Sequence, residues 1–414
     1  MSKSIVILCS LDSKGKEAAF LKDRIEAHGA KAILVDISIG GEPRIPPDIT
    51  SEEVAKAGGG NIFEIRATKD TGRVTPIMVK GASVKVLELH GEGRLDGVIA
   101  FGGASNTTAA TAVMKTLPFG IPKFMVSSTA SMPAYAASYI GTKDITMMHS
   151  VVDIAGLNDL SMAVLERAAG GVCGMAESSK GAVKPMTSSP LIALTEFKFS
   201  DDCSQRVKDL LERKGYNVIP FHAQGIGDAA MEELIGQGLF DGVIDIVPAG
   251  VGEHLVGGNR DPGPTRLEAA GRLGIPQVIA PCGFDMISCG PLGRKDTNDP
   301  LWSKRRLAER KLFIPDEFRV QVRSSADELR EIAAAVAEKL NKSKGPVAFL
   351  IPTRGWSSLS VEGADLYDPE ADKVFVSELK GLVDGRIEVR DIDTDLNAPE
   401  FADRLVETLV ALME

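Results

Sequence analysis

The stretch LDGVIAFGGASNTTAA, from Leu95 to Ala110, decides the fold of this chain. Residues 98–101 form an apolar run that predicts a buried strand, and Gly102-Gly103 ends it. Small and hydroxyl residues follow, and the alanine-rich segment 109–114 predicts a helix. A strand, a glycine turn and a helix start bring unpaired backbone N–H groups and the positive end of the helix dipole to one point. The pattern therefore indicates an anion-binding turn; the alternative is an ordinary glycine-rich turn with a capping Ser or Asn.

The composition bounds the class of protein. A chain of 414 residues is too long for one hydrophobic core, so we expect two domains. The apolar content of 44% with few aromatic residues suits buried parallel strands covered by helices. The net charge of −10 argues against a nucleic-acid partner, and no apolar run is long enough to span a membrane. The five cysteines are scattered without metal-ligand spacing, so we expect no metal site and a reducing, cytoplasmic location.

The first half of the chain begins with a strand–helix–strand pattern. An apolar run at 4–9, a helical segment to about His28 and a second apolar run that ends at Asp36 predict a βαβ unit with a parallel sheet. An acidic residue at the end of the second strand is where dinucleotide-binding folds hold a ribose, but the G-x-G-x-x-G fingerprint is absent. Residues 40–81 are rich in Pro and Gly and predict an excursion from the sheet, either a flap or an oligomer contact. We expect the next helix at 82–90.

The second half of the chain repeats the first. Gly29, which ends the first helix, has its counterpart in Gly215, 186 residues later (215 − 29). The sequence Asp-Gly-Val-Ile occurs at Asp96–Ile99 and again at Asp241–Ile244, 145 residues later (241 − 96). The difference of 41 residues (186 − 145) accounts for the excursion that only the first half carries. Such matches in one order predict two domains of one topology.

We therefore expect an α/β fold with two Rossmann-like, doubly wound parallel-sheet domains related by internal duplication. The N-terminal, nucleotide-binding domain covers residues 1–183, with its insertion at about 40–81, and the C-terminal domain covers residues 190–414. Residues 181–190 predict a linker between them. In the second domain, the polar run 294–310 predicts a surface segment.

Short motifs along the whole chain carry a family resemblance. They are LDSKG at 11–15, GGASNT at 102–107, GTKDI at 141–145, SVVDIAGLN at 150–158, FHA at 221–223 with Gly225, GLFDG at 238–242 and RLEAA at 266–270. With them the chain resembles the family named for the tomato mosaic virus resistance protein and its ATP-binding domain, which has many bacterial members. The resemblance implies two Rossmann-like domains, bound ATP, with or without Mg²⁺, and a homodimer.

Two turns depart from the family pattern. Residues 130–133 read ASMP where the family shows Ala-Ser-Gly-Asp, which indicates a different loop shape. Residues 195–198 read TEFK where the family has a turn rich in Gly and Thr, which argues against an anion site at this position.

We expect the nucleotide at the strand-end loops of domain one, because open α/β sheets bind ligands at the carboxyl ends of their strands. Lys14 is a candidate for pairing with phosphate, and its alternative is a solvated lysine at a helix start. Asp36 is a candidate for holding the ribose, and its alternative is a surface aspartate in a turn. The predicted nucleotide-binding residues are Leu11, Asp12, Lys14, Gly15, Asp36, Gly102, Gly103, Ser105, Asn106, Thr107, Thr108, Ser128, Thr129 and Ser131.

The strand ends of domain two carry more titratable groups. Glu253, His254, Arg260, Asp285 and Arg354 predict a second small-molecule site at the crevice between the domains. His254 is the candidate general base, with Glu253 and Asp285 as further catalytic candidates.

Two function classes follow from these residues. The first is an ATP-binding regulatory or interaction protein, with the nucleotide in domain one. The alternative is an enzyme of the domain crevice that acts on a small carboxylate or another anionic metabolite, with or without ATP. In both, the expected partners are a nucleotide, a small anion and a second copy of the chain, with no nucleic acid and no membrane.

Overall fold

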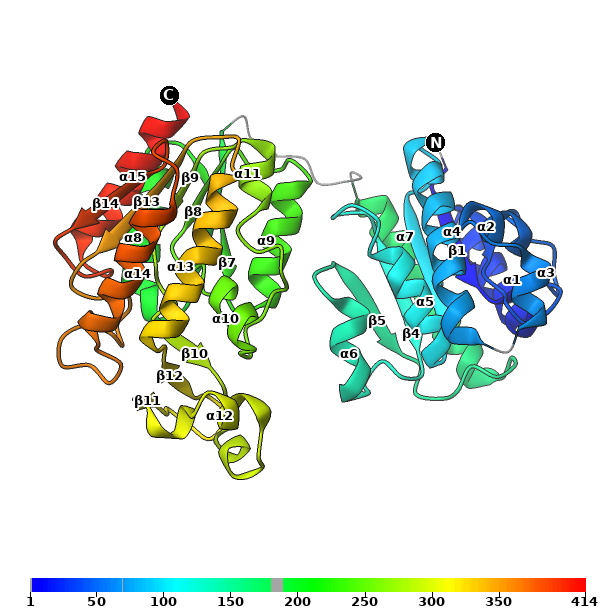
Figure 1. The fold of residues 1–414 in the computed structure, drawn as a ribbon. Coiled ribbons are helices and arrows are strands. Elements are labelled where there is room, and N and C mark those ends of the chain that lie inside the picture. Colours follow the sequence, from blue (N-terminus) through cyan, green and yellow to red (C-terminus); the bar gives the residue numbers. More distant parts are fainter. Residues whose placement is uncertain (1, 69, 180–188) are drawn as a thin grey trace. The chain divides into compact units, whose positions relative to one another are not determined.

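The computed structural model describes residues 2–68, 70–179 and 189–414, so most of the expected linker at 181–190 lies outside the described residues. The chain divides into two compact units, Met1–Val183 and Lys184–Glu414 (Figure 1). Both are Rossmann-like α/β units with a parallel sheet, as the sequence predicted. Among the described residues, no helix combines the length and the apolar character needed to cross a membrane.

Unit 1 contains a five-stranded parallel sheet in the order β2-β1-β3-β4-β5. Its strands are β1 (Ser4–Cys9), β2 (Lys31–Asp36), β3 (Gly97–Gly102), β4 (Lys123–Ser127) and β5 (Ile145–His149). Its helices are α1 (Leu11–Ala27), α2 (Ser51–Ala57), α3 (Ile62–Ala67), α4 (Thr71–Gly91), α5 (Ala104–Met114), α6 (Pro133–Ile140) and α7 (Asp159–Ser178).

The apolar runs of the central strands are buried on both faces of this sheet. In β1, Val6 and Leu8 pack with α4 and α5, while Ile5 and Ile7 pack with α1 and α7 on the opposite face. Alternate residues of a strand point to opposite faces, so a strand covered by helices on both sides must be apolar throughout. The continuous apolar run at 4–9 therefore indicates a sheet with helices on both of its faces.

The insertion expected at 40–81 is more helical than the sequence indicated. It contains α2 and α3, and α4 begins at Thr71 rather than near residue 82. The glycines here permit close helix packing: a Cβ on Gly81 would lie 1.8 Å from the carbonyl oxygen of Val54, and one on Gly58 would lie 2.0 Å from that of Ile77. Glycines of a stretch that the sequence predicted to be an excursion therefore lie where α2 and α4 pack closely together.

Unit 2 contains a six-stranded parallel sheet in the order β14-β13-β9-β8-β6-β7. Its strands are β6 (Leu191–Glu196), β7 (Asn217–His222), β8 (Gly242–Asp245), β9 (Gln277–Ile279), β13 (Val347–Pro352) and β14 (Glu388–Ile392). Its helices are α8 (Asp201–Arg213), α9 (Ile226–Gly236), α10 (Gly250–Val256), α11 (Ala269–Leu273), α12 (Pro300–Lys304), α13 (Ala326–Asn341), α14 (Pro369–Leu382) and α15 (Pro399–Met413). The order β7-β6-β8-β9-β13 repeats β2-β1-β3-β4-β5, as the internal duplication requires.

Unit 2 also carries a small antiparallel sheet in the order β10-β12-β11, from Met286–Ser288, Gln321–Arg323 and Leu312–Phe313. The polar run 294–310, expected at the surface, includes α12 and contributes to this sheet's own apolar core. Trp302 is 3% exposed, and its indole N–H donates to the carbonyl of Cys289 at 3.0 Å. Most of the run lies at the surface, as the sequence predicted, but Leu301, Trp302 and Leu307 are buried in a small core.

A buried arginine organises the strand ends of unit 2. The Arg266 guanidinium, 1% exposed, donates to Asp245 at the end of β8 at 2.8 Å and to Glu232 of α9 at 3.1 Å. Glu232 in turn accepts the backbone N–H groups of residues 267–269 at 2.6–3.2 Å, where α11 begins. Asp228 of α9 lies 3.5 Å from Arg266 Nε. Burial raises the pKa of Asp228 to about 6, against the opposing pull of Arg266.

This pKa predicts a pH dependence of stability. The folded-state pKa of Asp228 exceeds its unfolded value, so folding takes up a proton and the free energy of unfolding falls as the pH rises through about 6. We expect wild type to lose about 1.4 kcal/mol relative to Asp228→Asn between pH 5 and pH 7.5. Calorimetric Tm values across this range measure the difference. Asp327→Asn, at an exposed aspartate, is the control, and a pH-independent difference for Asp228→Asn would contradict the assignment.

Candidate functional site

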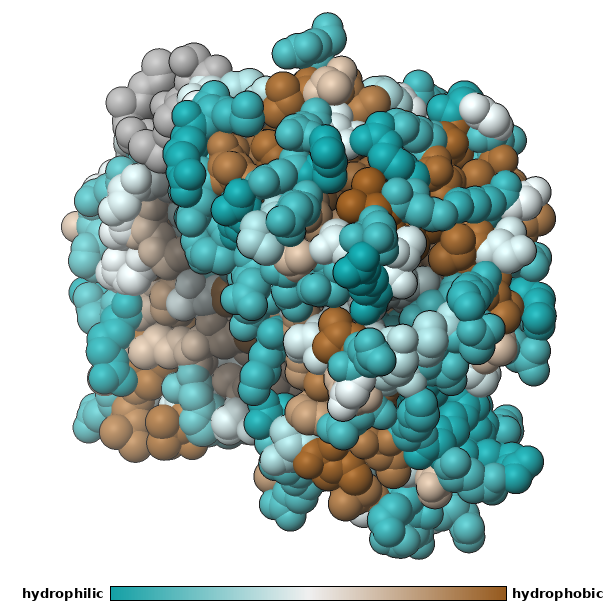
Figure 2. Space-filling model, turned by 90° about the vertical axis from the view of Figure 1, so that its left-hand side faces the viewer, coloured by the Kyte–Doolittle hydropathy of each residue, from teal (hydrophilic) through white to brown (hydrophobic). Residues whose placement is uncertain are grey.

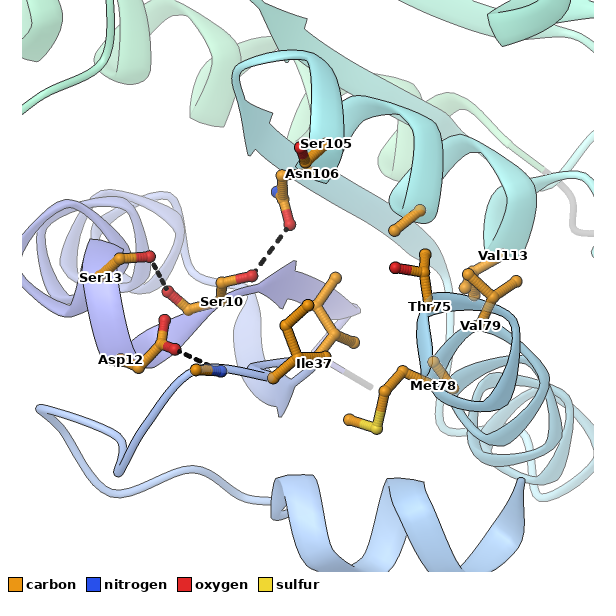
Figure 3. Close-up of a pocket in the computed structure, with 14 residues that line it drawn as sticks. Ser10, Asp12, Ser13, Ile37, Thr75, Met78, Val79, Ser105, Asn106 and Val113 are labelled. Atoms are coloured by element: carbon orange, nitrogen blue, oxygen red, sulfur yellow. Dashed lines mark hydrogen bonds between the residues drawn. The ribbon is translucent and has the colours of Figure 1, made fainter. Parts of the chain in front are cut away.

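A pocket of about 240 Å³ lies at the carboxyl ends of β1, β2 and β3 in unit 1 (Figure 3). The chain passes from β1 to its neighbour β2 and then returns to β3 on the other side of β1. Open α/β sheets bind ligands at this point of reversal. The lining residues are Ser10, Asp12, Ser13, Ile37, Ile39, Gly40, Thr75, Met78, Val79, Ala82, Ser105, Asn106, Ala109 and Val113.

Polar side chains form one side of the pocket. The Ser10 hydroxyl, after β1, donates to Asn106 Oδ1 at 3.4 Å, which joins the loops after β1 and β3 (Figure 3). Asn106 also donates its amide to the carbonyl of Phe101 at 2.6 Å. Asp12 Oδ2 accepts the backbone N–H of Gly40 at 3.1 Å and so ties the loop after β2 to α1. Hydrogen bonds between the loops therefore shape this wall.

The glycine turn places the start of α5 at the pocket. Gly102 has φ 148°, a conformation that L side chains rarely adopt, and Gly103 precedes the helix without a side chain to cap it. The first backbone donor inside the helix is Thr107, which bonds the carbonyl of Gly103 at 2.9 Å. The amides of residues 104–106 therefore have no intrahelical partner, and Ser105 and Asn106 line the pocket. The strand, glycine turn and helix start that the sequence predicted are present, and anion binding at this turn stays a prediction.

The opposite wall is apolar and comes largely from residues that sequence reasoning missed. Thr75, Met78 and Val79 of α4 and Val113 of α5 lie on the side of the pocket away from Ser10, Asp12 and Ser13 (Figure 3). They belong to the stretch expected to be a flap or an oligomer contact. A signal was available, because the pairs 75/79 and 78/82 have the i, i+4 spacing of one helix face. The oligomer contact stays a prediction, and the pocket wall is an observation.

Asp36 lies beneath the pocket rather than in its lining. The side chain is fully buried, and Oδ1 accepts the backbone N–H of Leu11 at 3.1 Å and of Ser38 at 3.0 Å, as well as the Ser38 hydroxyl. These bonds hold the loop after β2 against the start of α1. The amide of Leu11, predicted to face the nucleotide, is already occupied by this carboxylate.

Lys14 is also engaged within unit 1. Its ammonium donates to the carbonyl of Ile154, and Glu17, one turn further along α1, accepts the N–H of Gly156 at 2.7 Å. The motif SVVDIAGLN at 150–158 therefore docks on α1, and Asn158 caps α7. Gly15 of the same helix lies against Arg44, because a Cβ there would stand 2.8 Å from Arg44 Cβ.

The remaining predicted hydroxyls lie on the other side of the α5 start. Thr107 bonds Ser127 at 2.7 Å, Ser127 bonds Thr129 at 3.1 Å, and the Thr129 hydroxyl meets that of Tyr139 at 3.0 Å. This partly buried chain of hydroxyls links β4 to α5 and α6. Thr108 and Ser131 are exposed and, like Ser128, do not line the pocket. The structure thus brings Asp12, Ser105 and Asn106 together in the lining and gives other predicted residues structural contacts.

The five residues predicted as a second site do not share one pocket among the described parts of unit 2. Glu253, 1% exposed, pairs with the buried Arg260, whose Nε donates to it at 2.8 Å. His254 is 38% exposed and bonds Asp261 at 2.9 Å. Asp285 is buried and accepts the Ser357 hydroxyl at 2.6 Å, while the exposed Arg354 pairs with Asp393. Arg260 and His254 line two different pockets.

Metal-ligating side chains do not gather in groups of three or more within residues 2–68, 70–179 and 189–414. The five cysteines are free thiols, and all are buried. Asp12 is the carboxylate among the lining residues of the unit 1 pocket.

The duplicated sheets and the strand-end pockets define a two-unit Rossmann-like α/β protein. The chain belongs to the uncharacterised protein family UPF0261: residues 3–181 match its N-terminal domain and residues 189–413 its C-terminal domain. It is 38% identical over 415 residues to a UPF0261 protein of Clostridium tetani, with both chains covered completely. It is 35% identical over 348 residues to the ToMV resistance protein Tm-1(GCR237) of Solanum lycopersicum, which covers 82% of this chain and 45% of the tomato protein. The resemblance found in the motifs is confirmed.

Among solved structures, a UDP-N-acetylglucosamine 2-epimerase from Rickettsia bellii is similar with 11% identity and a TM-score of 0.22, over 67% of this chain and 78% of that chain.

The position of Asp36 generates a prediction that separates a structural role from a ribose contact. In Asp36→Asn the hydrogen bonds to the loop lose their charge-assisted character, and we expect a loss of about 1–3 kcal/mol of stability. Chemical denaturation measures it. Asp48→Asn is the matched control, because Asp48 accepts one backbone N–H of β2 at an exposed position. If Asp36→Asn keeps its stability but binds nucleotide more weakly, Asp36 contacts the ligand and its role is not structural.

Proposed function

We propose that unit 1 binds ATP in the pocket at the ends of β1, β2 and β3. The observation that carries the proposal is the juxtaposition of an apolar slot and an uncapped helix start in one pocket. An apolar wall from α4 and α5 suits the flat base, and the amides at the start of α5 suit a phosphate. The resemblance noted in the sequence names the same nucleotide.

The charges of the lining shape this proposal. The lining residues include no Lys or Arg, and Lys14 donates to the carbonyl of Ile154. Phosphate binding would therefore depend on backbone amides, the helix dipole and the Ser105 hydroxyl rather than on a cation. Where Mg²⁺ accompanies the nucleotide, Asp12 supplies the carboxylate oxygen that this ion prefers.

The proposal also includes a cytoplasmic location, which the five buried free thiols support. The enzyme alternative stays a prediction, and release of ADP from ATP in steady state is the measurement that separates it from binding alone.

The phosphate part of the site is tested at Gly103. A Cβ there would meet only Ser128 Oγ, at 3.8 Å, so the fold accepts a side chain at this position. We expect Gly103→Val to weaken ATP binding at least tenfold, because the side chain fills the space beside the α5 amides, and to leave adenosine binding unchanged. Calorimetry measures both ligands. Gly174→Val, in open space on α7, is the control. If folded Gly103→Val binds ATP as tightly as wild type does, the phosphate does not bind at this turn.

The base part of the site is tested at Ala109, which lines the apolar slot. A leucine there occupies much of a cavity of about 240 Å³, so we expect Ala109→Leu to weaken adenosine and ATP alike, at least tenfold. Thr108→Leu places the same side chain on the exposed face of α5, outside the pocket, so we expect no loss of affinity for ATP or adenosine. A loss in Thr108→Leu alone would favour the sequence-based assignment of Thr108 over the pocket.

A further inference from the structure

Unit 2 has its own strand-end pocket, of about 430 Å³. Its lining comes from the loops after β6 and β7, from the segment after α10 and from the small antiparallel sheet. The lining residues are Lys198, Phe199, His222, Gln224, Asn259, Arg260, Ser288, Phe313, Pro315, Phe318, Arg319 and Gln321.

This pocket shares with the proposed ATP pocket its place at the ends of the first two strands of the unit. By the duplication offset of 186 residues, Lys198 is the counterpart of Asp12 (198 − 12) and His222 the counterpart of Asp36 (222 − 36). The strand pairs agree, since β6 lies between β7 and β8 as β1 lies between β2 and β3. Lys198 therefore stands in the lining of this pocket where Asp12 stands in that of unit 1, and His222 lines it at the position where unit 1 has the buried Asp36.

The lining is cationic, with Lys198, Arg260 and Arg319 and no carboxylate among its residues. Arg260 is the buried member, at 2% exposure. Its Nε donates to Glu253 behind the pocket, and its Nη1 has no hydrogen-bond partner among the described residues. Nε and Nη2 of Arg260 both lie on Glu253 Oε1, at 2.8 and 2.6 Å, so Nη1 is the buried N–H group that lacks an acceptor in the part of the chain that the structure describes. At the rim, Arg319 pairs with Asp316.

The other walls are aromatic. Phe199 and Phe313 pack edge to face, with their ring centroids 5.8 Å apart. Phe318, in the loop between β11 and β12, is 70% exposed, and Ile314 of the same loop is 42% exposed. The lower projection of the molecule, which carries this small sheet, shows a gathered apolar surface in Figure 2. Phe197 lies behind the pocket, with the Arg260 guanidinium carbon 5.5 Å from its ring centroid.

We propose that this pocket binds a small organic anion in which a carboxylate or phosphate group is attached to a flat apolar ring. The oxyanion accepts from Nη1 of Arg260, with Lys198 at the entrance, and the ring lies among Phe199, Phe313 and Phe318. The sequence argued against an anion site here because the turn at 195–198 lacks glycines. Side-chain donors take the place of the backbone amides used in unit 1.

The experiment titrates the full chain with benzoate, phenyl phosphate and benzamide, by calorimetry or ligand-observed NMR. We expect benzoate or phenyl phosphate to bind with a Kd of about 1 mM or tighter, and benzamide, which has the ring without the charge, to bind at least tenfold more weakly. The stronger of the two anions identifies the oxyanion. Binding of neither anion up to about 10 mM, or equal binding of benzamide, would overturn the proposal.

Variants at exposed positions keep the test independent of folding. We expect Phe318→Ala to weaken the anion about tenfold and Lys198→Gln about threefold. The matched controls are Phe63→Ala on α3, where the side chain is 68% exposed, and Lys342→Gln on the surface of unit 2. Unchanged affinity in both Phe318→Ala and Lys198→Gln would place the anion elsewhere.

Arg260→Lys keeps the charge beside Glu253 but removes the unpaired Nη1, and we expect at least a tenfold loss of anion affinity where its Tm shows that it folds. If Arg260→Lys does not fold, the variants Phe318→Ala and Lys198→Gln test the proposal. Gly103→Val in unit 1 leaves the anion affinity unchanged, so failure of the ATP proposal and failure of this one are distinguishable.

Discussion

The constraint on which both units depend is that backbone groups at the carboxyl ends of buried parallel strands must find partners inside the protein. In unit 1 the buried Asp36 carboxylate accepts two backbone N–H groups and a hydroxyl where β2 ends. In unit 2 Asp245, at the end of β8, accepts the Thr195 hydroxyl at 2.7 Å and the Arg266 guanidinium at 2.8 Å. Thr195 in turn accepts the N–H of Val247 at 2.9 Å. In each unit, buried charged side chains therefore hold the strand-end loops in place through hydrogen bonds within the protein.

This division of labour explains how one topology supports two different pockets. The buried polar layer fixes where the loops leave the sheet, so the residues above that layer can change without moving the loops. At equivalent positions unit 1 carries Asp12 and unit 2 carries Lys198. The lining of the first pocket lacks Lys and Arg and includes an uncapped helix start, whereas that of the second includes a lysine, two arginines and aromatic side chains. Chemistry differs while architecture repeats.

Most of the fold could be predicted from the sequence, because apolar runs, helix ends and the 186-residue repeat are local or periodic signals. The site could be predicted only in part. The turn at 102–103 was found because its geometry is encoded locally. Asp36 and Lys14 were assigned to a ligand because residue type does not reveal burial or an acceptor distant in sequence, such as the carbonyl of Ile154. The wall supplied by α4 was missed because the Pro and Gly residues of 40–81 indicated an excursion from the sheet rather than a helix.

The same reasoning decides what family membership can say about function. The motif at 150–158 docks on α1 through Lys14 and Glu17, and the motif at 266–270 contains the arginine that organises the strand ends of unit 2. These motifs carry architecture, so a relative that has them shares the fold whatever it binds. The lining of the unit 1 pocket is mixed, because Asp12, Ser105 and Asn106 belong to the motifs at 11–15 and 102–107, whereas Ala109 lies outside them. A claim that a relative binds the same ligand therefore has to be argued from its lining residues.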